Sequence, residues 1–115
     1  MPKVNIDNAF FGVITINGQK HETDLTVYWD GEILQRDRRH NLTKSYIDEL
    51  LLKEPEVIVI GTGNSGLMKV DTAAEVSAKI HGVEVVSKAT PLAAQEFNKF
   101  MRLKKRVVAV MHATC

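Results

Sequence analysis

The stretch VIVIGTGNSG, residues 57–66, begins with four consecutive aliphatic residues and ends in a glycine-rich turn. A strand without polar alternation is typical of a parallel sheet that helices cover on both faces. The three glycines have the spacing G-x-G-x-x-G, which in dinucleotide-binding domains holds a pyrophosphate at a helix N-terminus. The stretch therefore predicts a buried parallel strand and raises the question of a nucleotide site.

The residues beyond the turn argue against a dinucleotide. Residues 67–71 separate Gly66 from the expected cap of the next helix, whereas the fingerprint opens directly into its helix. The following strand ends at Ser87-Lys88, without the carboxylate that binds ribose hydroxyls. We expect no bound dinucleotide, and we interpret Gly61 and Gly63 as residues that let the chain turn tightly after a buried strand.

Helical and strand patterns alternate in the second half of the chain. Thr43 is the expected cap of a first helix, which stops before Pro55. A second helix is expected to begin with the capping box from Thr72 to Glu75, and a third with the cap Thr90 followed by proline. Strands are expected at 57–60, 83–87 and 107–111. This order predicts a partly parallel sheet, in which the direction of strand 107–111 stays open.

The first third of the chain has the signals of antiparallel strands. Asn17-Gly18 and Asp30-Gly31 are pairs that favour type I′ hairpin turns, in which both central residues have positive φ. Residues 12–36 therefore predict a meander of three or four strands. We expect one α/β domain over residues 1–115, with three layers: a mixed central sheet, flanking helices and the N-terminal antiparallel β-meander packed against the sheet.

Composition excludes several classes of function. The 115 residues are 44% hydrophobic and 25% charged with a net charge of +1, which provides no global field for nucleic acid. No apolar run reaches the roughly 18 residues of a membrane span, and no secretory signal is visible, so a cytoplasmic protein is expected. The one cysteine is Cys115, and the four histidines lack ligand spacing. We expect no metal and no cofactor.

Two groups of residues are candidates for binding. If strands 57–60 and 83–87 are parallel, their carboxyl ends form a crevice of the kind that holds ligands, although the same residues are also ordinary polar loop residues. The candidates there are Gly61, Thr62, Gly63, Lys88 and Thr90. The second group, Arg38, Arg39 and His40, is the most concentrated charge in any predicted loop and is a candidate surface for an anion or an acidic partner.

A second basic run lies at the end of the expected third helix and at its exit toward the next strand. Its members are Arg102, Lys104, Lys105 and Arg106. Cations in the last turn of a helix offset the helix dipole, which we favour over a role in binding phosphate.

Several motifs together resemble a small family of uncharacterised biochemistry that includes the adipogenesis-associated domain proteins and a mitochondrial complex I assembly factor. The resemblance covers residues 11–115. Its carriers are Phe11-Gly12 with Asn17-Gly18, residues 57–63, the pattern Thr90-x-x-Ala93-x-x-x-Phe97-Asn98, the run Lys105-Arg106-Val107-x-Ala109 and the ending His112-Ala113-Thr114-Cys115. Members usually have tyrosine at the position of Phe97.

The resemblance implies a three-layer fold with a mixed sheet and supplies no catalytic residues to transfer. It favours a non-enzymatic protein-interaction or assembly module with a protein partner. The alternative is a small-molecule or anion-binding protein, including an enzyme, that uses the crevice at Thr62 and Thr90. A homo-oligomer stays open, and neither a nucleic acid nor a membrane is expected as a partner.

Overall fold

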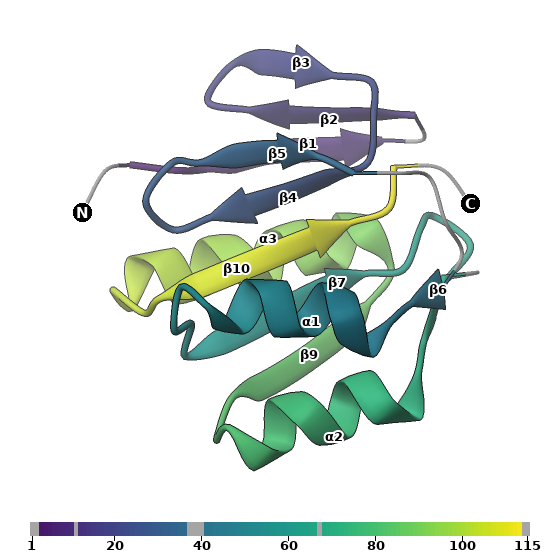
Figure 1. The fold of residues 1–115 in the computed structure, drawn as a ribbon. Coiled ribbons are helices and arrows are strands. Elements are labelled where there is room, and N and C mark those ends of the chain that lie inside the picture. Colours follow the sequence, from purple (N-terminus) through teal and green to yellow (C-terminus); the bar gives the residue numbers. More distant parts are fainter. Residues whose placement is uncertain (1–2, 11, 37–40, 67, 114–115) are drawn as a thin grey trace.

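The computed structural model describes residues 3–10, 12–36, 41–66 and 68–113. Within these ranges the chain forms three helices and ten strands (Figure 1). The helices are α1 (Lys44–Leu51), α2 (Thr72–Ile80) and α3 (Thr90–Arg102). The strands are β1 (Ile6–Phe10), β2 (Val13–Ile16), β3 (Gln19–His21), β4 (Leu25–Tyr28), β5 (Ile33–Gln35), β6 (Asn41–Leu42), β7 (Val57–Gly61), β8 (Lys69–Val70), β9 (Glu84–Lys88) and β10 (Val107–Met111).

The central sheet is mixed and has the strand order β5-β4-β10-β7-β9. Strands β7, β9 and β10 are parallel to one another, as the alternation of helices and strands predicts. Strand β10 also pairs antiparallel with β4, so the direction that the sequence left open is now settled. The last strand in sequence order therefore lies in the middle of the sheet.

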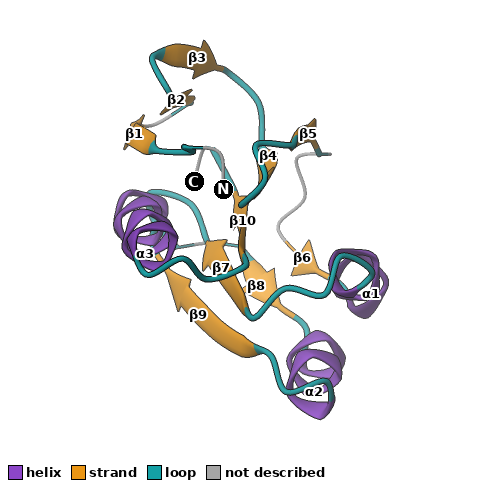
Figure 2. Cartoon of the chain, turned by 90° about the vertical axis from the view of Figure 1, so that its left-hand side faces the viewer, coloured by secondary structure: helices purple, strands orange, loops and turns teal. Residues whose placement is uncertain are grey.

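Strand β7 explains why the fold has three layers. All five of its residues are buried, which confirms the expectation for a strand covered on both faces. Its valines face a cluster with α3 and β1, whereas Ile58 and Ile60 face a second cluster with α1 and α2. Figure 2 shows α3 on one side of the central sheet and the other two helices on the opposite side.

The N-terminal meander is a separate sheet of β1, β2 and β3. Its β2–β3 turn has positive φ at both Asn17 (49°) and Gly18 (81°), as expected. The amide of Asn98 in α3 holds β1 by two 2.8 Å hydrogen bonds, accepting from the backbone N–H of Ile6 and donating to its carbonyl. The meander thus packs against α3, which covers one face of the central sheet. The predicted fold class is confirmed.

The predicted extent of the meander is wrong at both ends. It begins at Ile6, upstream of residue 12, and β4 and β5 belong to the central sheet, because β4 pairs with β10. The second turn pair is also not of type I′. Gly31 has a φ of 96°, but Asp30 is outside the positive region, and its carboxylate instead accepts a 3.0 Å hydrogen bond from the N–H of Glu32.

Of the three predicted helix caps, only Thr43 is confirmed. Its hydroxyl accepts from the N–H of Tyr46 at 3.4 Å. Asp71, not Thr72, occupies the cap position of α2, because the carbonyl of Asp71 already accepts from the N–H of Glu75. The Asp71 side chain makes no capping hydrogen bond, and no capping box forms. Helix α3 has Ala89 at the cap position, and Thr90 is the first helical residue.

Candidate functional site

The strand register brings distant segments to one edge of the central sheet. Met111 of β10 lies opposite both Gly61 of β7 and Leu25 of β4, and Gly61 lies opposite Lys88 of β9. Because β4 is antiparallel to the others, it begins where they end. The residues just before β4 and just after the three parallel strands therefore meet at this carboxyl edge.

Thr90 is the centre of the glycine turn at this edge. Its hydroxyl donates to the carbonyl of His112 at 2.7 Å and accepts from the N–H of Gly63 at 2.8 Å. The N–H of Thr90 donates to the carbonyl of Gly63 at 3.1 Å. The hydroxyl that the sequence predicts as a helix cap therefore forms a buried bridge between distant segments instead, and Ala89, at the cap position of α3, makes no side-chain cap hydrogen bond.

The two glycines of β7 and its turn serve different purposes. Gly63 has a φ of 102°, a conformation that favours glycine, so the interpretation as a turn residue holds there. Gly61 does not have positive φ. A Cβ atom on Gly61 would lie 3.0 Å from both Sδ of Met111 and Oγ1 of Thr90, so glycine is needed here for close approach.

The structure brings the five predicted crevice residues together. Thr62 donates to the carbonyl of Lys88 through its backbone N–H (2.9 Å) and its hydroxyl (3.1 Å), and Gly63 is bonded to Thr90 as described. The Lys88 side chain is exposed. Hydrogen bonds within the chain thus already engage both threonine hydroxyls, and a ligand role for these residues stays a prediction.

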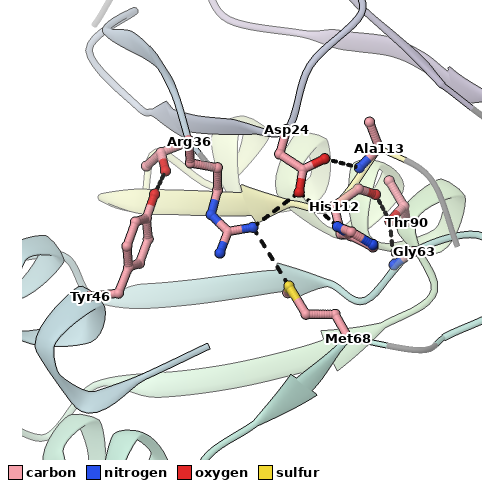
Figure 3. A network of polar contacts seen from close by, with 9 residues as sticks. Asp24, Arg36, Tyr46, Gly63, Met68, Thr90, His112 and Ala113 are labelled. Carbon is pink, nitrogen blue, oxygen red and sulfur yellow. Dashed lines mark hydrogen bonds and ion pairs between the residues drawn. The ribbon is translucent and has the colours of Figure 1, made fainter. Parts of the chain in front are cut away.

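Asp24, immediately before β4, organises a second polar group at the same edge (Figure 3). Its Oδ2 accepts from Nδ1 of His112 at 2.7 Å and from Nη1 of Arg36 at 3.3 Å. Its Oδ1 accepts from the N–H of Ala113 at 2.9 Å. The side chains of Asp24 and His112 are fully inaccessible, and that of Arg36 is 5% exposed. Burial of a charge requires such pairing.

Arg36 extends this group toward α1. Its guanidinium lies over the ring of Tyr46, 4.9 Å from the ring centroid, and its Nη1 donates to Sδ of Met68 at 3.6 Å. The Tyr46 hydroxyl is hydrogen-bonded to the hydroxyl of Thr26 in β4. Arg36, directly after β5, therefore connects the buried ion pair to two further parts of the chain. It contacts helix α1 through Tyr46 and the segment before β8 through Met68.

Sequence reasoning missed Asp24, Arg36, Tyr46 and the side-chain role of His112. Asp24 is the acidic residue directly before a strand of four buried residues, and His112 belongs to the C-terminal motif of the resemblance. Neither position has a spacing that signals the other. The signal that was available is the presence of ionisable residues at the borders of apolar strands.

The chemistry of the site is that of a structural clamp. Asp24 and His112 are inaccessible, and their hydrogen bonds join chain segments. In the described part of the chain, no group of three or more His, Cys, Asp or Glu side chains is placed to hold a metal ion.

Ionisable groups around α1 have shifted pKa values. Hydrogen bonds from Lys44 and from the hydroxyl of Ser77 lower the pKa of Asp48, which thereby links α1 to α2. Burial raises the pKa of Tyr28, and nearby Tyr46 adds to the rise. Hydrogen bonding thus favours the charged form of Asp48, whereas burial favours the neutral form of Tyr28.

The second predicted site, Arg38, Arg39 and His40, lies outside the described residues. Its two flanks are described. Arg36 is fixed on one side by the ion pair with Asp24, and β6 pairs in parallel with β8 on the other.

Comparison with solved structures defines the class of fold. A conserved hypothetical protein of Pyrococcus horikoshii OT3 is similar with a TM-score of 0.85 and 24% identity, covering 99% of this chain and 100% of that one. A protein of Xanthomonas campestris has a TM-score of 0.82, 19% identity and coverage of 98% and 86%. A Bordetella pertussis protein described as a Mth938-like domain has a TM-score of 0.77, 18% identity and coverage of 98% and 89%. The fold is therefore Mth938-like.

Residues 6–112 match the family model described as protein of unknown function (DUF498/DUF598). The chain belongs to this family. None of the helices in the described ranges has the length and apolar character that a membrane crossing requires.

Proposed function

We propose that this protein is a non-enzymatic interaction module that binds an acidic surface of a protein partner through Arg38, Arg39 and His40. The observation that carries the proposal is the buried ion pair of Arg36 and Asp24, which immediately precedes the cationic segment. The backbone is fastened there as well, because the N–H of Arg36 donates to the carbonyl of Asp24 at 3.0 Å. Binding residues are commonly held on loops that a rigid scaffold positions.

The other flank of the segment is equally well anchored. Leu42 is fully buried, and its carbonyl accepts a 2.9 Å hydrogen bond from the N–H of Asp71. Thr43 then caps α1. Fixing both flanks lowers the conformational entropy that a binding segment loses on association.

Charge supports an acidic partner. Arg38, Arg39 and His40 are adjacent in sequence, and Asp37 is the only carboxylate beside them. Arginine guanidinium groups bind carboxylates with two parallel hydrogen bonds, which suits an acidic protein surface. The motif resemblance to the complex I assembly factor and the adipogenesis-associated domain proteins also supports an interaction role.

The carboxyl edge of the sheet favours a non-enzymatic role, because its buried polar side chains hold the chain together. The hydroxyl of Thr90 and the carboxylate of Asp24 are engaged in hydrogen bonds that hold the chain together. A nucleophile or general base has to reach a substrate, whereas both side chains are buried. This geometry favours a structural role for them.

The proposal is tested by affinity capture with the full chain, followed by titration with the captured partner. Arg38→Ala/Arg39→Ala is compared with Lys20→Ala/Lys79→Ala, which removes the same charge from exposed positions elsewhere. The expected result is loss of the partner with the first variant alone, and binding to the unaltered chain that weakens as salt rises. Melting temperatures establish that both variants are folded. Equal affinity of the two variants for the partner would refute the proposal.

A further inference from the structure

A groove of about 540 Å³ lies between the segment that precedes β1 and the carboxyl half of α3. Its volume is within the range of roughly 300–1,000 Å³ that is usual for small-molecule sites. Val4, which is buried, and Met101, which is partly buried, provide apolar lining. The groove is thus large enough for a small organic molecule and offers apolar contact to it.

Three cations line the same groove: Lys3, Arg102 and Lys104. They come from opposite ends of the sequence and are brought together by the packing of β1 against α3. Among the described residues, no carboxylate belongs to the lining and none of the three cations forms an ion pair. Like charges gathered at one surface repel one another and attract anions.

The neighbouring cations do have partners. Lys105 and Arg106 lie 3.6 and 3.4 Å from carboxylate oxygens of Glu56, and Lys99 lies 3.5 Å from Glu96. The basic run after α3 is therefore divided into two parts. Lys105 and Arg106 share the one carboxylate of Glu56, whereas Arg102 and Lys104 line the groove.

The helix dipole explains why a cation is favourable at Arg102, but it does not explain the cation at Lys104. Arg102 lies in the last turn of α3, where a cation is favourable. Lys104 lies beyond the helix and has a φ of 58°, a conformation in which glycine is less strained. The position of Lys104 thus costs conformational energy while it adds a cation to the groove.

We propose that this groove binds a small anion with an apolar body. The anionic head lies among Lys3, Arg102 and Lys104, and the body lies against Val4 and Met101. The inference goes beyond the proposed function, because it concerns a different surface and a different class of ligand.

Anilinonaphthalene sulfonate is the test probe, because its fluorescence rises when it binds apolar surface. N-phenylnaphthylamine has the same aromatic body without the sulfonate and is the matched neutral probe. We expect saturable binding of the sulfonate at least about tenfold tighter than binding of the neutral probe, as loss of two or three charge contacts implies. Competition by decanoate but not by decanol would extend the site to alkyl carboxylates; competition by neither would restrict it to aromatic anions.

Variants locate the site. Arg102→Gln/Lys104→Gly is expected to weaken sulfonate binding by about tenfold without lowering the melting temperature, because glycine suits the positive φ at residue 104. Lys99→Gln/Lys105→Gln removes two cations that have partners outside the groove and is expected to leave binding unchanged. Nuclear magnetic resonance should show the largest amide shifts at Val4 and Met101. Equal affinity for the two probes, unchanged binding by the first variant, or amide shifts confined to another surface would each overturn the proposal.

Discussion

Asp24 and His112 are 88 residues apart in sequence, yet Oδ2 of the one lies 2.7 Å from Nδ1 of the other, and both side chains are fully inaccessible. The contact exists because β4 and β10 pair antiparallel, so that the residue before one strand meets the residue after the other. Arg36 binds to the same oxygen atom of Asp24. One carboxylate therefore holds three segments of the chain together.

Replacing Asp24 by alanine should lower the free energy of unfolding by about 3–5 kcal/mol, the range for removal of one member of a buried ion pair. The change leaves the guanidinium of Arg36 buried without its carboxylate and frees the N–H of Ala113. Urea denaturation followed by circular dichroism measures the loss. Asp71→Ala is the matched control, because the Asp71 side chain makes no capping hydrogen bond. Equal losses for the two variants would contradict the role of Asp24.

Thr90→Val should cost about 1–3 kcal/mol of unfolding free energy, because the N–H of Gly63 and the carbonyl of His112 lose their shared partner. Valine has nearly the shape of threonine, so the change removes the hydroxyl and little packing. Thr90→Ser keeps the hydroxyl and serves as the control, with a smaller loss expected. Thermal denaturation of both variants measures the difference. A serine variant that is less stable than the valine variant would show that the methyl group, and not the bridge, matters.

Asp48→Asn should reduce the dependence of stability on acidic pH. The pKa of Asp48 in the folded protein is lower than the ordinary value of 3.8 because of hydrogen bonds from Lys44 and Ser77. The resulting stabilisation is complete above about pH 3.8 and is lost as the pH falls through the lower folded-state pKa. The stability difference between the original protein and the variant should therefore shrink on acidification. Glu49→Gln, at the adjacent exposed position, is the control. A difference that stays constant with pH would contradict this assignment.

Lys104→Gly should raise the free energy of unfolding by about 0.5–1 kcal/mol, because a lysine at a φ of 58° is strained and glycine is not. Lys104→Ala removes the same charge but keeps a Cβ atom, so it should give no such gain. Chemical denaturation of the two variants separates backbone strain from charge. A gain of the same size in both variants would attribute the effect to charge repulsion with Lys3 and Arg102.

Local sequence patterns predicted the elements well because their causes are local. The unbroken apolar run at residues 57–60 indicates a strand that is buried on both faces of the sheet. The pair Asn17-Gly18 indicates a turn in which both residues have positive φ. The prediction that Thr90 is the cap of α3 was wrong, because threonine followed by proline is also the sequence pattern typical of a helix N-terminus. The N–H of Gly63, in the turn after β7, and the carbonyl of His112, directly after β10, bind the same hydroxyl, and the local sequence around Thr90 does not show these distant partners.

The polar group at the carboxyl edge could not be found in the same way. Asp24, Arg36 and His112 meet only through the register of β4 with β5 and β10, so no helical or strand periodicity relates them. The splitting of the expected meander has the same origin. Strand β4 has the pattern of a hairpin strand, but its partner on one side is β10 from the far end of the sequence.

The central position of β10 has a consequence for how the protein is made. In the sheet, β10 lies between β4 and β7. During translation, β4 and β7 leave the ribosome well before residues 107–111, so both strands lack β10 as their partner until the end of this sequence has emerged. Both faces of the core need Val107–Met111, because its side chains alternate between the two apolar clusters. The central sheet can therefore form only after residues 107–111 have been translated. Until then, β4 and β7 each have an unpaired edge, which a chaperone can protect from aggregation.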